Sequence, residues 1–301
     1  MNQAWYPFVF LPIHKPVGPT SHDMVARVRR LLPRKTKVGH TGTLDPFASG
    51  ILLMAVGKAT KFADFLHELP KQYMAEIRLG VRTNTLDPTG EEDLTMPVPA
   101  LTPEKLEAVR QSFLGPYDQI PPAFSAKKVQ GKKSYQLARK NQAVDLPPKR
   151  VTLHELELTQ NAPDRLMCRV VCSTGTYVRA LARDIGEALG TCASLTTLVR
   201  DKVGDVSLDA CADVDKLTFE ELGRWSLPVS QVLSRFPEVA LPHRAYTFFI
   251  EGRPFHTDQS LPSEFLAVFK RGEEMGAVFR CKADKGTVAP RGLCYLAPDL
   301  Q

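Results

Sequence analysis

The chain has 301 residues, 43% apolar and 24% charged, with a formal net charge of +6 at pH 7, which suits one large globular domain or a large and a small one. No apolar run approaches the roughly 20 residues that cross a bilayer, and the first ten residues lack the basic region of a secretory signal. The six cysteines are scattered without a CxxC pair, which argues against a zinc ribbon and favours reduced thiols in a cytoplasmic protein.

The first predicted element is an amphipathic helix. Thr20 and Ser21 can cap it, and Pro33 ends it. Its apolar face is formed by Val25, Val28, Leu31 and Leu32. The helix and its exit also carry a basic cluster, made of Arg27, Arg29, Arg30, Arg34, Lys35 and Lys37.

An alternating pattern then predicts a half-buried strand that ends at Gly80, followed by a turn over 87–90. The inward positions of this strand are Tyr73, Ala75, Ile77 and Leu79. A second helix is expected over 103–113, because Thr102 and Pro103 form a helix start and Gly115 follows its end.

Residues 118–150 hold two Pro-Pro pairs, a short polar helix expected over 134–140 and too few large apolar residues for a core of their own. Within 120–150, eight Lys or Arg face one Asp, so this segment carries +7 and the rest of the chain about −1. Basicity concentrated in one segment favours a polyanionic partner. A solvated lysine-rich surface is the alternative.

Two further strands are predicted over 151–158 and 166–172. A helix follows, with Thr176 as its expected cap and Leu181, Ile185 and Leu189 along one face. Another strand is expected to begin near Leu195 and to continue through Leu198.

The pattern changes after Leu227. Residues 236–242 read as a linker, and short strands are predicted over 245–250, 265–270 and 275–279. This spacing indicates a small β-rich appendage.

The segment 39–50 is the most informative part of the chain. It sets a single carboxylate, Asp45, between turn-forming glycines and Pro46, and the apolar run 51–56 follows. Glycine and proline constrain the backbone here, which favours a positioned reactive group. A carboxylate that only caps a turn is the alternative.

Five segments resemble the TruB-type tRNA pseudouridine synthases, in the order that this family has them. They are KPVGPTS at 15–21, GHTGTLDPFASG at 39–50, KQY at 71–73 with LGVRT at 79–83 and Asp87, QIPPAFSA at 119–126 with GKK at 131–133, and CSTGTYVR at 172–179.

The resemblance implies an α+β fold, in which a mixed, mostly antiparallel sheet with flanking helices carries an RNA-gripping insertion at about 118–150. It implies a catalytic domain over 1–236 and a small β-rich, PUA-like RNA-binding domain over 237–301. The implied activity is isomerisation of uridine 55 in the T-loop of tRNA, by a monomer that needs no guide RNA. No cofactor or metal is expected, and the sequence has neither a GxxxxGK[ST] loop nor a His/Cys ligand cluster.

The same resemblance implies roles for individual residues. Asp45 is the expected essential carboxylate, which attacks C1′, attacks C6 or removes a sugar proton; these routes stay open. Arg179 is expected to fork onto Asp45 with two hydrogen bonds. Tyr73 is expected to stack on the uracil and to take part in proton transfer at C5.

Further residues are expected to bind the substrate. His40 would occupy the space left by extruded nucleotides, and Leu198 would line the uracil pocket. Tyr177 would contact the sugar or support Arg179. Lys15 would support the site, with a surface lysine as the alternative. Lys132 and Lys133 would contact phosphates.

Three other functions compete with this interpretation. A non-catalytic RNA chaperone would use the same cleft, and a pseudouridine synthase could combine isomerisation with chaperone activity. An RNA-guided relative would need partner proteins. A zinc-dependent deaminase is excluded, because its H-x-E and P-C-x-x-C signatures are missing.

Overall fold

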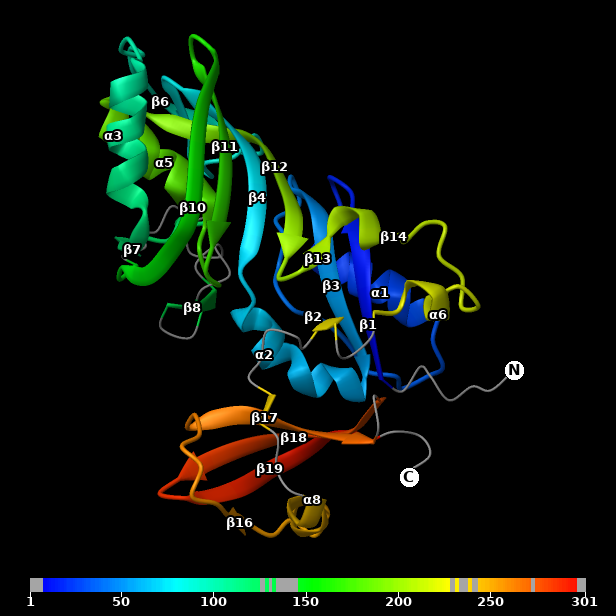
Figure 1. Cartoon of the computed structure of the whole chain (residues 1–301). Coiled ribbons are helices and arrows are strands. Elements are labelled where there is room, and N and C mark those ends of the chain that lie inside the picture. Colours follow the sequence, from blue (N-terminus) through cyan, green and yellow to red (C-terminus); the bar gives the residue numbers. More distant parts are fainter. Residues whose placement is uncertain are drawn as a thin grey trace.

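A computed structural model describes residues 8–124, 128–129, 132–133, 146–227, 231–232, 238–239, 243–271 and 274–296. Its main feature is a ten-stranded sheet with the order β14-β1-β3-β12-β4-β11-β10-β7, on which β2 pairs with β3 and β13 with β12 (Figure 1). Among the described strands of this sheet, only the pairs β1·β14 and β12·β3 are parallel. The predicted α+β class with a mostly antiparallel sheet is confirmed.

The strands of this sheet are, in chain order, β1 (Phe8–Lys15), β2 (Val38–His40), β3 (Ser49–Gly57), β4 (Lys71–Leu79), β7 (Gly115–Gln119), β10 (Lys149–Ala162), β11 (Arg165–Cys172), β12 (Ala193–Val203), β13 (Val206–Ser207) and β14 (Ala212–Asp213). Two small hairpins accompany it, β5 (Val81–Thr83) with β6 (Glu92–Thr95) and β8 (Lys128–Val129) with β9 (Lys132–Lys133). The strand predicted around Tyr73 is confirmed, since burial alternates residue by residue along β4. The helix expected over 134–140 lies outside the described residues.

The helices are α1 (Ser21–Arg30), α2 (Ala63–Glu68), α3 (Pro103–Phe113), α5 (Val178–Leu189), α6 (Leu222–Trp225) and α8 (His243–Ile250), with short 3₁₀ turns η1 (Lys58–Phe62) and η2 (Leu208–Ala210). Thr20 caps α1 in a reciprocal capping box with Asp23, and Thr102 caps α3, as predicted. The expected cap by Thr176 is wrong. Tyr177 holds the N-cap position of α5, and the Thr176 hydroxyl donates instead to the Ser173 carbonyl.

Helices α1 and α5 cover the same face of the sheet. The strand register sets Arg200 opposite both Gly50 and Tyr73, so the side chains of these positions share one face. Residues two apart on a strand point to the same face. On the face of Tyr73, α5 packs over the following inward residues of β4. On the face of Gly50, α1 packs over the following inward residues of β3. The loop 41–48 contacts both helices, because Leu44 is hydrogen-bonded to Ser21 of α1 and shares a buried cluster with residues of α5.

A second sheet has the order β15-β17-β18-β19-β16. Its strands are β15 (Glu238–Val239), β16 (Phe255–His256), β17 (Glu264–Arg271), β18 (Glu274–Asp284) and β19 (Thr287–Leu296). Leu266 and Val278 of this sheet share a buried cluster with Phe62 of η1 and Val203 of β12. In Figure 1 the second sheet accordingly lies against the end of the main body that carries α2. Of the expected linker over 236–242, only β15 is described.

The strand predicted over 245–250 is wrong, because these residues belong to helix α8. Ala245 and Phe249, four positions apart, are its buried residues, and they pack on Phe265 and Phe279. The segment is apolar at most positions, so its sequence period did not separate helix from strand. Among the described residues, no helix is long and apolar enough to cross a membrane.

Gly50 allows β3 and β12 to approach each other. Its φ is +113°, and a Cβ atom built there would lie 2.2 Å from the Arg200 carbonyl oxygen. We therefore expect Gly50→Ala to lower the free energy of unfolding by about 2–4 kcal/mol, measured by urea denaturation. Gly39→Ala is the control, because a Cβ atom at Gly39 meets nothing within 4 Å. Equal effects of the two substitutions would contradict this explanation.

Candidate active site

The loop that carries Asp45 is fixed at both ends by buried groups. The Ser21 hydroxyl donates to the Leu44 carbonyl at 3.0 Å and accepts from the Leu44 N–H at 2.9 Å. The Lys15 Nζ donates to the carbonyls of Ala48 (2.7 Å), Pro16 (2.8 Å) and Pro46 (3.3 Å). Lys15 is fully buried, which excludes the surface alternative, and burial lowers the pKa of its ammonium to about 8. Lys15 thus holds the turn around Asp45 rather than facing solvent.

Asp45 and Arg179 are brought together, as predicted. The Arg179 Nε lies 2.9 Å from the Asp45 Oδ2. The arginine side chain is 6% exposed and the carboxylate 33% exposed, so the carboxylate is the member of the pair that a substrate can reach. Arg179 lies in the first turn of α5, where the positive end of the helix dipole does not stabilise a cation. Its position therefore depends on acidic and carbonyl partners.

The expected two-bond fork is wrong. Within the described residues Nε has no aligned hydrogen-bond partner, so its contact with Asp45 is an ion pair. The remaining guanidinium nitrogens turn elsewhere: Nη1 donates to the Thr85 carbonyl at 2.9 Å and Nη2 to the Phe124 carbonyl at 3.1 Å. A second carboxylate, Asp87, competes for the same cation and has its Oδ2 3.3 Å from Nη1.

Asp87 was not singled out as a site residue from the sequence. It is 4% exposed, and its Oδ1 accepts from the Thr85 hydroxyl at 2.8 Å and the Thr89 N–H at 2.9 Å. The preceding Leu86 has a φ of +62°, an uncommon value for a side chain of this size. The Asp-Pro-Thr-Gly turn signal was visible in the sequence, but nothing there indicated that its carboxylate is buried.

The pKa of Asp45 is raised above its ordinary value. Burial is the main cause, and the negative charge of Asp87 adds to it. The charges of Arg179 and Lys15 oppose the rise. Asp45 is thus held in balance between two cations and one anion.

Arg200 is a further buried cation, and it was not predicted from the sequence. It is 2% exposed, and it donates through Nε to the Ile51 carbonyl (2.8 Å) and through Nη2 to the Gly42 carbonyl (3.0 Å). It therefore joins the start of β3 to the loop before Asp45. The signal was its position two residues beyond Leu198, on the same face of a strand that was predicted to continue through Leu198.

Tyr73 lies on the same face, directly opposite Arg200 in the register. It is 8% exposed, and burial raises the pKa of its hydroxyl, while the charge of Arg200 and a hydrogen bond from it oppose that rise. Tyr73 and Leu198 share one buried cluster with Leu44 and Phe47 of the Asp45 loop. The Tyr73 ring and the loop that carries Asp45 therefore contact the same buried cluster.

The other predicted residues surround this region less closely. His40 is half-buried at the end of β2, and burial lowers the pKa of its imidazole. Tyr177 is held by Gln119, whose amide accepts from its N–H at 2.8 Å and donates to its carbonyl at 3.1 Å. For Lys132 and Lys133 only the backbone, in β9, is described.

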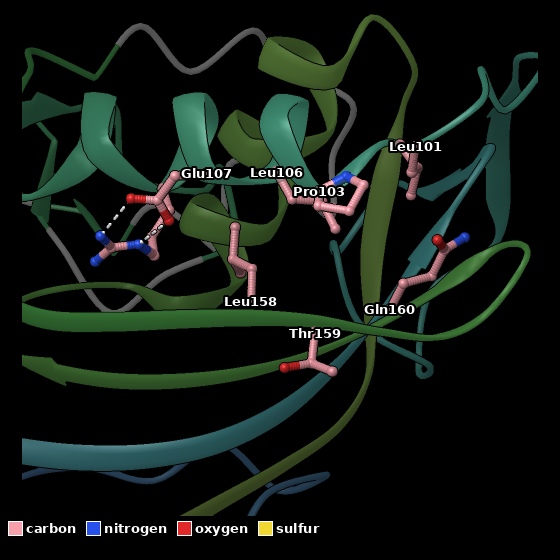
Figure 2. A pocket seen from close by; sticks show the side chains of 8 residues that line it. Leu101, Pro103, Leu106, Glu107, Leu158, Thr159 and Gln160 are labelled. Atoms are coloured by element: carbon pink, nitrogen blue, oxygen red, sulfur yellow. Dashed lines mark hydrogen bonds and ion pairs between the residues drawn. The ribbon is translucent and has the colours of Figure 1, made fainter.

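A pocket of about 300 Å³ lies elsewhere, between α3 and β10 (Figure 2). Its lining includes Leu106, Leu158 and the Glu107–Arg110 ion pair. No predicted site residue contributes to it.

Residues 29–178 match the TruB family pseudouridylate synthase N-terminal domain. A tRNA pseudouridine synthase B from Caldanaerobacter subterraneus subsp. tengcongensis is 44% identical over 86% of this chain and 90% of its own length. The protein of that name from Ralstonia nicotianae is 40% identical over 95% and 94%. The chain belongs to the TruB family of pseudouridylate synthases.

Its enzyme class is therefore isomerase. The fold agrees: a chain in the crystal structure of a Cbf5-Nop10-Gar1 complex superimposes with a TM-score of 0.72 at 22% identity, covering 98% of this chain and 87% of that one. At this identity the likeness concerns the TruB-type fold alone.

The charge balance at Asp45 predicts opposite effects for two substitutions. Arg179→Gln removes a cation and should raise the pKa of Asp45, whereas Asp87→Asn removes an anion and should lower it. The measurement is a carbon-13 NMR titration of the Asp45 carboxyl carbon, assigned with Asp45→Asn. Asp215→Asn, at an exposed ion pair with Arg27, should leave it unchanged. Shifts of one sign for both site variants would contradict the arrangement.

Proposed function

We propose that this chain isomerises uridine 55 in the T-loop of tRNA to pseudouridine. Relatives 40–47% identical to it carry the name tRNA pseudouridine synthase B. The observation that carries the proposal is a reachable carboxylate, Asp45, held 2.9 Å from a buried guanidinium and flanked by Tyr73.

In this reaction the bond between C1′ and N1 breaks and a bond between C1′ and C5 forms. A proton leaves C5 and one is gained at N1, so no electrons or atoms are exchanged with a co-reactant. Asp45 must be ionised in each of the three routes, whether it attacks C1′, attacks C6 or removes a sugar proton. Arg179 supplies the charge that keeps it so, and Asp87 holds Arg179 in place.

Tyr73 is proposed to stack on the uracil and to take part in removing the C5 proton. Its position directly opposite Arg200, in one buried cluster with residues of the Asp45 loop, supports that placement. Leu198 would line the base pocket beside it. His40 would fill the space left in the loop, and Tyr177 would contact the sugar next to Arg179.

A uridine inside a folded loop must be everted to reach Asp45, and the unstacking cost must be offset by new contacts. We propose that the segment 118–150, with Lys132 and Lys133, supplies phosphate contacts for this step. The proposed catalytic domain spans 1–236, and a PUA-like RNA-binding domain spans 237–301. The protein is proposed to act as a cytoplasmic monomer on the T-arm without a guide RNA, which activity of the purified chain on a bare T-arm transcript would test.

Asp45→Asn tests the proposed function directly. We expect pseudouridine formation on a T-arm transcript to fall at least about 10³-fold, because the amide can neither attack nor accept a proton. The readout is tritium release from C5-labelled uridine. Asp215→Asn is the control and should retain full activity. Product formation by Asp45→Asn at the wild-type rate would contradict the proposal.

The same binding steps would allow the protein to act as a tRNA folding chaperone. Asp45→Asn separates the two activities. A chaperone function would survive in this variant, measured as refolding of a misfolded tRNA, while isomerisation would be lost.

Arg200 is proposed as a positioning residue. Arg200→Lys keeps the charge, but one ammonium cannot span carbonyls in the loop and in β3. We expect kcat to fall about 10²-fold with KM little changed, because the loop carrying Asp45 would shift. Arg169→Lys, at an exposed pairing with Glu155 and Glu157, is the control. A wild-type kcat for Arg200→Lys, in protein with a native thermal melt, would contradict this role.

A further inference from the structure

Exposed cations gather where α1 ends and β2 and β3 meet, at a distance from Asp45. We name this surface the basic rim; its members are Arg30, Arg34, Lys35, Lys37 and Lys58, all exposed. Lys37 and Lys58 are neighbours, because the Gly57 N–H donates to the Lys37 carbonyl at 2.7 Å. The sequence has no Asp or Glu between Asp23 and Asp45. Within the described part of the chain, no ion pair involves any member of the rim, so their charges face solvent unneutralised.

Lys35 occupies a backbone conformation that disfavours it. The Thr36 N–H donates to the Pro33 carbonyl at 3.2 Å, which closes a tight turn, and Lys35 is the third residue of that turn with a φ of +73°. This position favours glycine or asparagine, and a lysine there costs of order 1 kcal/mol. A long cation at a strained, exposed turn contributes no packing that offsets this cost. Lys35→Gly would therefore remove one charge of the rim without removing packing, which makes this position a suitable probe of the rim.

The rim and Asp45 are connected by rigid elements. Helix α1 starts beside the Asp45 loop, where Ser21 bonds Leu44, and ends at Arg30, about 15 Å away at 1.5 Å per residue. Strand β3 runs from Gly50 near the site to Gly57 at the rim, about 23 Å at 3.3 Å per residue. A ligand that contacts both regions must therefore extend for some 15–23 Å.

We infer that the basic rim binds backbone phosphates of the RNA stem that adjoins the target loop. This inference rests on the proposed function, which supplies the loop at Asp45. The phosphate backbone of an RNA stem is a polyanion long enough to span this distance, and it would supply the negative charges that the rim lacks. Recognition of a helical stem by its shape needs no base contacts. The rim is separate in sequence from the basic segment 118–150, so the stem and the loop would be held by different parts of the chain.

The test is Lys35→Gly, assayed by fluorescence anisotropy with two RNAs, a T-arm stem-loop and the same loop sequence as a single strand. We expect several-fold weaker binding of the stem-loop, a salt dependence of log K shallower by about one unit, and unchanged binding of the single strand. The thermal midpoint should stay or rise, because glycine relieves the strain. A structural role for Lys35 would instead lower it.

Lys216→Gly is the control, since Lys216 is also an exposed lysine but lies outside the rim and outside the segments proposed to bind RNA. It should leave the affinity difference between the two RNAs unchanged. Wild-type affinity and salt slope for Lys35→Gly, or equal losses on both RNAs, would overturn the inference. Failure of the proposed function would be seen separately, as wild-type protein that binds RNA and forms no pseudouridine.

Discussion

The structure around the candidate site depends on one buried guanidinium placed between two carboxylates. Arg179 is almost inaccessible, and a buried cation is unstable unless charges and hydrogen bonds compensate its lost hydration. Asp87 accepts hydrogen bonds within its own turn through Oδ1 and contacts Arg179 from one side through Oδ2. Asp45 contacts it from the other and keeps part of its surface exposed. The asymmetry assigns the two carboxylates different tasks: Asp87 fixes the cation, and Asp45 remains available to a substrate.

The remaining architecture serves to hold that geometry. The Asp45 loop has little secondary structure of its own, so its carbonyls need donors from outside, and Lys15 and Arg200 provide them. Both cations are buried, and both reach the loop from strands of the central sheet. Gly50 permits the close approach of β3 and β12 that brings Arg200 to the loop. Precision of this kind is what a reaction that tolerates little displacement requires.

Much of this could be predicted from the sequence, for identifiable reasons. The strand at Tyr73 and the helices after Thr20 and Thr102 were predictable because alternation and capping are local signals. The contact of Asp45 with Arg179 followed from the family resemblance. Asp87 was matched to a family motif without a role in the site, and Arg200 was not found, because burial of a charged residue depends on segments distant in the chain. The helix at 245–250 was misassigned because a nearly continuous apolar run carries no period.

The central claim is that an ionised Asp45, kept so by Arg179 against the effect of burial, drives the reaction. Its most direct test is the single-turnover rate of pseudouridine formation as a function of pH, compared with the NMR titration of the Asp45 carboxyl in the same protein. Because burial raises the pKa of Asp45, the rate should fall with decreasing pH above the ordinary range of an aspartate, and its midpoint should coincide with that titration. An undiminished rate at a pH where the Asp45 carboxyl is already protonated would contradict the account.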